Sequence, residues 1–155
     1  MYIPTATLTQ GSRGGEQLDY AQTTSDTGIT ASTEGTAITI VSGAALNFDG
    51  NTTIVVEFWA SVYAANSVGT NLTMYLFQDG SSIGIIGEFR NNVATNGVNT
   101  PVFCTAYLTP TAGSHTYSIR GASSVAGGNN LTVYAGAGGS GNRRPAFMRI
   151  YRASS

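Results

Sequence analysis

The chain has 155 residues, a length that suits one domain with its own hydrophobic core. Its net charge is −1 and only 10% of its residues are charged, so composition gives no case for binding nucleic acid or an anionic membrane. The single cysteine, Cys104, excludes an internal disulfide, and the apolar run PVFCTAYL predicts that its thiol is buried and unreactive. The polar first residues and the lack of a long apolar run predict neither a secretory signal nor a membrane span.

Residues 1–27 are polar and show no periodicity, and we predict that they form an extended arm. Apolar side chains occur along this segment at wide intervals, at Tyr2, Ile3, Leu8, Leu18 and Tyr20. So few apolar residues do not fold alone, but an extended segment laid along a partner gains backbone hydrogen bonds and side-chain burial. We therefore predict that the arm anchors the chain to a partner; the alternative is a leader without function.

From Gly28 onward the sequence shows about nine or ten short strands between turn signals, and no convincing helical pattern. The residues 52–62 form the longest predicted strand. DGSS at 79–82 predicts a hairpin between the strands on either side of it. These features are typical of an all-β fold, and we predict an antiparallel β-sandwich, jelly-roll-like, over residues 28–155.

Two predicted strands carry large apolar side chains on both faces. Trp59 and Val55 lie on the face opposite Ile54, Val56, Phe58 and Ala60, and Tyr75 and Phe77 lie opposite Leu72, Met74 and Leu76. Either the second face is covered by the arm or another subunit, or these are central strands of a tightly packed sandwich. On the first interpretation Trp59, Tyr75 and Phe77 are subunit contacts, and a closed homotrimer would bury them.

Residues 136–141 spell G-x-G-x-x-G, and Arg143 and Arg144 follow directly. A dinucleotide site needs a helix after these glycines, because the helix N-terminus binds the pyrophosphate. Pro145 and the alternating AFMRIY predict a strand instead. We interpret the segment as a glycine-rich loop before the last strand and expect no cofactor. The arginines are expected to pair with carboxylates or to contact a partner.

No arrangement of residues indicates a catalytic or metal site. His115 is the single histidine, and there is no G-x-S-x-G motif. Asp49 and Asp79 stand in D-G turns, which leaves Glu57 and Glu88 as a candidate pair for glycoside hydrolysis. We expect these two to be surface charges or arginine partners. Exposed tyrosine and tryptophan on a sandwich could also stack on a sugar, but core or subunit packing is the preferred interpretation.

The phrases ITIVSGAALNFDGNTTIVVEFWA, TPTAGSHTYSIRG and GAGGSGNRRPAFMRIYRA resemble a group of small β-domains encoded by tailed bacteriophages. Such domains occur in tail-fibre-like and head-decoration proteins and as short proteins of actinobacterial phages. The resemblance covers about residues 28–153 and includes no catalytic signature.

The resemblance implies a jelly-roll-like sandwich on a virion, often in a symmetric trimer. A short arm and one domain, without a shaft of repeats, suit a capsid decoration or auxiliary protein better than a whole fibre. We therefore expect a non-enzymatic virion protein that contacts itself and a major capsid or tail protein, on the head rather than the tail. The alternatives are a tail or fibre-tip module that binds a host-surface glycan, and a hydrolase with Glu57 and Glu88 in one cleft.

Overall fold

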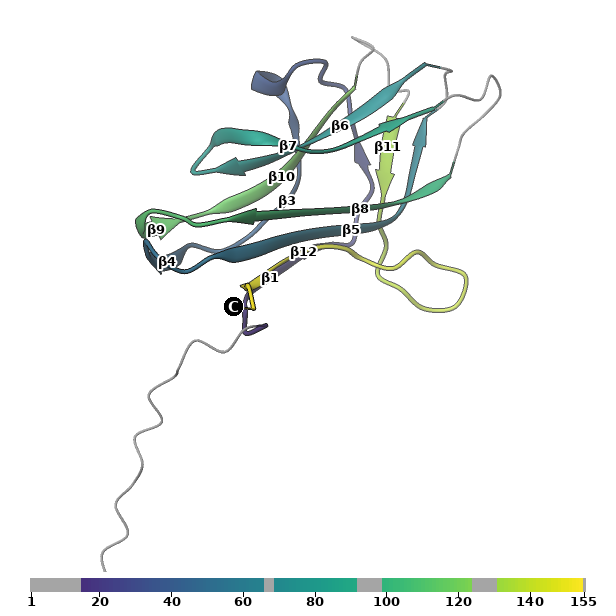
Figure 1. The fold of residues 1–155 in the computed structure, drawn as a ribbon. Helices are drawn as coiled ribbons and strands as arrows, with labels where there is room; N and C mark the ends of the chain where they lie inside the picture. Colours follow the sequence, from purple (N-terminus) through teal and green to yellow (C-terminus); the bar gives the residue numbers. More distant parts are fainter. Residues whose placement is uncertain (1–14, 66–68, 92–98, 124–130, 155) are drawn as a thin grey trace, which may run out of the picture.

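The computed structural model describes residues 15–65, 69–91, 99–123 and 131–154. Two antiparallel sheets pack face to face, and a short two-stranded sheet closes one end (Figure 1). The larger one, sheet A, contains β1 (Gln17–Thr23), β2 (Thr27–Gly28), β5 (Ile54–Ala65), β8 (Thr100–Leu108), β11 (Leu131–Tyr134) and β12 (Ala146–Arg152). Sheet B contains β3 (Ile38–Ser42), β6 (Asn71–Gln78), β7 (Ser81–Arg90) and β10 (Tyr117–Ser123). The third sheet pairs β4 (Leu46–Asp49) with β9 (Ala112–His115).

The strand order of sheet A is β1-β12-β5-β11-β2, with β8 on the other side of β5. Sheet B has the order β3-β10-β6-β7. The described helical structure is a single turn of 3₁₀ helix, η1 (Glu34–Thr36). The fold class predicted from the sequence, an all-β antiparallel sandwich of jelly-roll-like form, is confirmed. No helix in the described segments is long and apolar enough to cross a membrane.

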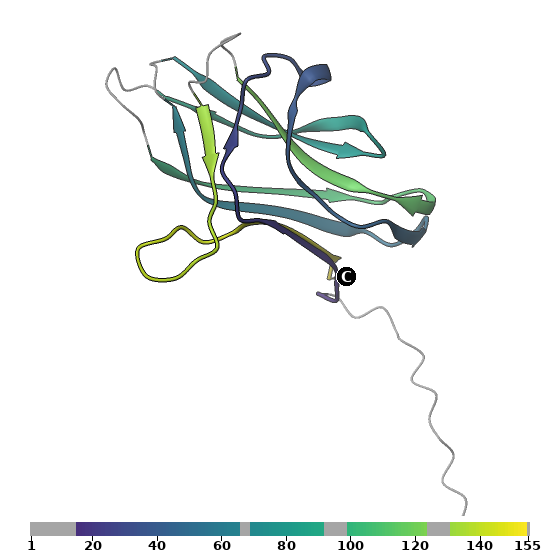
Figure 2. The same ribbon diagram turned by 180° about the vertical axis from the view of Figure 1, so that it is seen from behind.

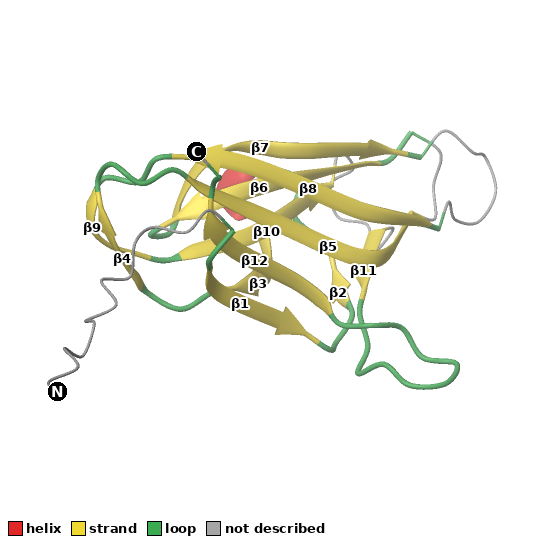
Figure 3. Cartoon of the chain, turned by 60° about the horizontal axis from the view of Figure 1, so that its bottom comes forward, coloured by secondary structure: helices red, strands yellow, loops and turns green. Residues whose placement is uncertain are grey.

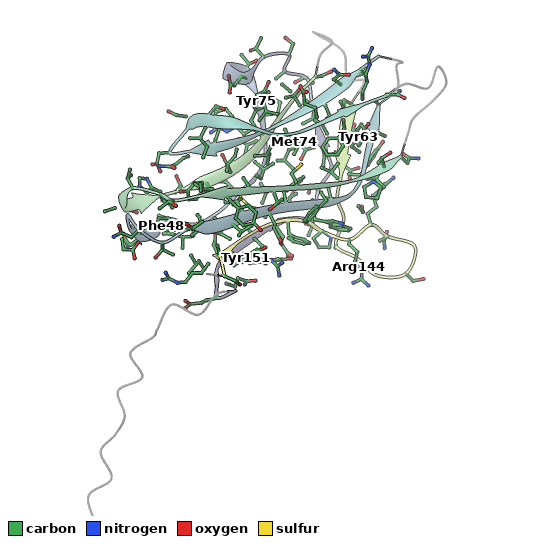
Figure 4. The ribbon with its side chains drawn as sticks, in the orientation of Figure 1. Phe48, Tyr63, Met74, Tyr75, Arg144 and Tyr151 are labelled. Carbon is green, nitrogen blue, oxygen red and sulfur yellow. The ribbon has the colours of Figure 1, made fainter. Side chains whose placement is uncertain are left out.

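The alternation predicted for β5 sets the inner face of sheet A. Ile54, Val56, Phe58 and Ala60 are completely buried in the core. The pairing of β5 with β8 shifts register between Ala60 and Tyr63, so the phase of the alternation changes there. The odd-numbered residues of β5 before this shift lie on the outer face, but Tyr63 faces the core. It lies between the sheets with Met74 (Figure 4).

The hairpin predicted at 79–82 is present. Asp79 and Gly80 have φ values of 52° and 84° between β6 and β7, as a two-residue hairpin turn requires. After β8, Ala112–His115 forms β9 and pairs with β4.

The N-terminal segment joins the sandwich earlier than we expected. Residues 17–23 form β1, which pairs with the last strand, β12, and satisfies one side of its backbone. Glu16 also accepts a hydrogen bond from the Arg152 guanidinium at 2.8 Å. The sandwich thus starts before the predicted boundary at Gly28. Tyr2, Ile3 and Leu8 lie outside the described residues, and the anchoring role of the arm stays a prediction.

Candidate functional site

The outer face of sheet A carries six aromatic side chains on four adjacent strands. Figure 3 shows β8, β5, β12 and β1 side by side, in that order. In the register of the sheet, Trp59 of β5 is the cross-strand partner of both Phe147 and Phe103. Four residues earlier in β5, Val55 has Tyr151 and Tyr107 as its partners. We call this surface the aromatic face; it consists of Tyr20, Trp59, Phe103, Tyr107, Phe147 and Tyr151.

Three of these rings stack across β1, β12 and β5. The Phe147 ring lies between Tyr20, at a centroid distance of 5.5 Å, and Trp59, at 5.8 Å. The planes are inclined at 28° and 26°, so neighbouring rings contact each other by their faces. Both faces of the Phe147 ring are thereby covered, and a planar ligand cannot stack on it.

The two aromatic residues on β8 are much more open to water. Phe103 is 57% exposed and Tyr107 is 71% exposed. Large apolar side chains are seldom left in this state on an edge strand unless another surface covers them. The aromatic face therefore has two parts: a stack of three rings on β1, β12 and β5, and two solvent-exposed rings on the edge strand β8.

An ion pair between Arg149 and Glu57, with no net charge, lies among the aromatic rings. The Arg149 guanidinium donates to Glu57 at 2.5 Å, and the Tyr151 hydroxyl donates to the other oxygen of Glu57. Partial burial raises the pKa of Glu57, but the hydrogen bonds from Tyr151 and Arg149 outweigh it and hold that pKa below its usual value. The hydrogen bond from Tyr151 to Glu57 raises the pKa of Tyr151. This carboxylate is ionised and paired, so it cannot serve as an acid catalyst.

Glu57 and Glu88 do not face one cleft. Glu57 lies on the outer face of sheet A, whereas Glu88 lies on the outer face of sheet B, where Thr73 donates to it at 3.4 Å. Tyr75, whose pKa is raised by burial and by the charges of Glu34 and Glu88, marks that opposite face (Figure 4). The hydrolase alternative that required these two carboxylates in one cleft is therefore not supported by the geometry.

His115 lies between a carboxylate and a hydroxyl. Its Nδ1 is 2.6 Å from Asp79 Oδ2, and its Nε2 is 3.0 Å from Thr111 Oγ1 and 3.2 Å from the Thr111 carbonyl oxygen. Asp79 also accepts a hydrogen bond from the Thr116 amide. The Gln78 amide nitrogen also lies 3.0 Å from Nδ1, so both ring nitrogens have close hydrogen-bond partners. The group ties the turn after β6 to β9 and β10.

The glycine-rich loop 135–145 projects beside sheet A (Figure 2). Two of its amides donate within the loop, from Gly136 and Gly138 to the carbonyls of Arg144 and Arg143. A strand, β12, follows the loop, as we expected. The Arg143 guanidinium stacks over Tyr134 at 4.0 Å. In the part of the chain that the structure describes, neither Arg143 nor Arg144 forms an ion pair, whereas Arg149 and Arg152 do.

The structure brings some predicted interface residues together and separates others. Tyr20, Trp59 and Arg144 line one depression of about 540 Å³ beside the Phe147 ring. Tyr75 and Phe77 lie on the other side of the sandwich. Phe77 is buried by its own chain, since it packs against Ala37 and lies 4.0 Å beneath the Arg120 guanidinium.

Leu18 is partly buried against the core. Sequence reasoning missed Phe103, Tyr107, Phe147 and Tyr151. The alternation in PVFCTAYL and AFMRIY contains that signal, because these residues lie opposite the core positions Val102, Cys104, Met148 and Ile150. No three or more His, Cys, Asp or Glu side chains gather as metal ligands within the described segments.

No protein-family model and no curated protein matches this sequence. The similar solved structures include the sugar-binding C-terminal domain of EclA, with 14% identity over 97% of this chain and 88% of that chain, at a TM-score of 0.41. A carbohydrate-binding module from Cellvibrio mixtus lichenase 5A has 17% identity over 90% and 91%, at 0.38. A structure of infectious bursal disease virus, Gt strain, has 16% identity over 88% of this chain and 37% of that chain, at 0.40. Similarities at this level do not bear on the function of the chain.

Proposed function

We propose that this chain is a non-enzymatic structural protein of a bacteriophage particle, a decoration or auxiliary protein that assembles through the outer face of sheet A. The observation that carries the proposal is the aromatic face, with six rings around one neutralised ion pair. Burying such a surface gains about 25 cal/mol for each Å² of apolar area removed from water. A paired Glu57 and Arg149 add no net charge that would oppose the contact.

The sequence resemblance supports the assignment to a phage particle. On this proposal residues 1–14 anchor the sandwich to the capsid, or alternatively to the tail, and the sandwich projects outward. The location on the head and the trimer are implications of the resemblance. A non-enzymatic role accords with the described candidates for catalysis: Glu57 is paired, Glu88 lies on the opposite face, and both His115 ring nitrogens have close hydrogen-bond partners.

A glycan-binding module is the second candidate, and the depression beside Phe147 favours it. Trp59, Gln22 and Arg144 line this depression, so an apolar ring, an amide and a cation are available to a sugar. We rank it second because the stack covers the Phe147 ring on both faces. If the natural protein binds a glycan array and Trp59→Ala does not, glycan binding would become the preferred function over assembly.

The test of the assembly role uses particles of the bacteriophage that encodes the chain. Antibodies raised against the purified protein are expected to label the head of intact particles. Deletion of residues 2–14 is expected to leave the sandwich folded and to abolish incorporation; a longer deletion would remove β1 and disturb the fold. Particles without label, or normal incorporation of the shortened chain, would contradict the virion role and the anchoring role respectively.

A further inference from the structure

The exposed apolar side chains of the described residues are concentrated on one side of the sandwich. Five large ones are exposed, and four of these lie on two edge strands: Ile83 and Ile85 on β7, and Phe103 and Tyr107 on β8. These two strands are the edges of sheets B and A, and they lie next to each other (Figure 3). Within the described segments β8 pairs with β5 on one side, and its other backbone edge has no strand partner.

Strand β8 lacks the features by which edge strands avoid pairing. It carries no charged residue over its nine residues, and its proline, Pro101, stands near its start. In contrast, the edge strand β7 carries Glu88 and Arg90. Charged side chains and prolines within an edge strand prevent it from pairing with another chain. The segment Val102–Leu108 has neither, so two copies can approach along it without electrostatic repulsion.

We propose that β8 pairs antiparallel with β8 of a second copy, around a twofold axis at Thr105. In this register Phe103 lies opposite Tyr107 of the second copy, and Tyr107 lies opposite its Phe103, so both exposed rings gain a cross-strand aromatic partner. The inward positions Cys104 and Ala106 face each other in the same way. A register centred on Cys104 would place both aromatic rings opposite Pro101 or Thr105 instead. The two A sheets join into one continuous sheet.

This inference rests on the proposed assembly role, and it replaces the trimer that the resemblance implies with a pair of chains. Because Thr105 faces its own copy at the axis, a charge placed there meets an identical charge. Thr105 is exposed in the single chain, so substitution there leaves the core unchanged. Thr105→Lys and Thr105→Glu are each expected to prevent pairing, and an equimolar mixture of the two is expected to restore it.

The measurement is light scattering of the full chain at micromolar concentration. We expect a mass of about 32 kDa for the natural sequence, twice the chain mass of 16.0 kDa, and about 16 kDa for each variant alone. The mixture returns to the mass of two chains. The matched control is Thr39→Lys, an exposed threonine on β3, the other edge of sheet B, which is expected to keep the mass of the natural protein.

A single chain for the natural sequence, a mass of three chains, variants that still pair, or a mixture that stays separate would each overturn the proposed pairing. Glu57 of β5 is the cross-strand partner of Thr105, so a charge at position 105 can change the stability of the fold. The thermal melting of Thr105→Lys and Thr105→Glu is therefore compared with that of the natural protein first. If Thr105→Glu does not fold, Phe103→Lys mixed with Tyr107→Glu tests the same register, since those residues meet across the axis. Particle labelling is scored separately, so failure of the pairing is distinguishable from failure of the virion role.

Discussion

The ring of Phe147 in β12 stacks on the ring of Trp59 in β5, with centroids 5.8 Å apart. The two residues are direct partners in the sheet register. Tyr20 of β1 covers the other side of Phe147, so one ring is held between two others on three adjacent strands. The stack helps to hold the first strand of the sandwich against the last one, and it fixes half of the aromatic face.

Phe147→Ala is expected to lower the free energy of unfolding by about 1–3 kcal/mol, since each aromatic pair contributes roughly 0.5–1.5 kcal/mol beyond burial of its area. Tyr20→Ala removes one stacking contact and is expected to cost less. Urea denaturation at fixed protein concentration gives both values. Ile83→Ala, on an exposed residue with no ring partner, is the control. Equal effects for Phe147→Ala and Ile83→Ala would show that the stack does not stabilise the fold.

Acid is expected to destabilise the fold through Asp79 and Asp49. Hydrogen bonding to His115, and then to the Thr116 amide, lowers the pKa of Asp79 from 3.8 to about 2. The Asn51 and Thr52 amides lower the pKa of Asp49 to about 2 as well. A carboxyl whose folded pKa is depressed stabilises the protein above its unfolded pKa. That stability is lost as the pH falls from about 4 to about 2.

Urea midpoints measured at several pH values across this range are therefore expected to fall with acid in the natural protein. Asp79→Asn removes one contribution and is expected to give a shallower fall, while Asp49→Asn with Asp79→Asn flattens it further. An unchanged slope in the double variant would mean that other carboxyl groups cause the acid sensitivity.

The sequence predicted the inner faces of the sandwich well, because alternation is a local signal. Ile54, Val56 and Phe58 in β5 are buried as their spacing indicated. It did not predict β1, since the partner that makes Gln17–Thr23 a strand is β12, at the other end of the chain. QLDYAQT has few apolar residues, and its pairing with β12 makes it a strand.

The candidate site was predictable in part. Trp59 was expected on the second face of its strand, and it lies there. Phe77 was expected on a face open to partners, but Ala37 and Arg120, distant in sequence, cover it. Tertiary contacts of this kind decide which outward-facing rings remain exposed. The spacing of apolar residues in the sequence does not predict such contacts.

The Cys104 thiol is expected to be unreactive in the folded protein. Burial raises its pKa to about 11, and the thiolate is the reactive form. Reaction with a soluble disulfide reagent near pH 8 is expected to be slower than in the urea-unfolded chain by a factor on the order of 10² or more. The absorbance of the released thiol follows the reaction. Similar rates in both states would contradict the burial of Cys104.

Gly87 provides the space that the Cys104 sulfur occupies. A Cβ atom at position 87 would lie 2.7 Å from Cys104 Sγ and 3.1 Å from the Phe89 ring. Gly87→Ala is therefore expected to lower the free energy of unfolding by about 1–3 kcal/mol. In a Cys104→Ala background the cost is expected to be smaller, because the sulfur is gone. Denaturant unfolding of the four proteins in this cycle checks the coupling, and strictly additive effects would contradict the contact.

The central claim is that the aromatic face is an assembly surface on a virus particle. A cryo-electron microscopy reconstruction of the intact bacteriophage particle tests it most directly. The account predicts density for the sandwich on the particle, with Trp59, Phe103 and Tyr107 covered by a neighbouring subunit. A sandwich that is absent from the particle, or one whose aromatic face points into solvent, would contradict the claim.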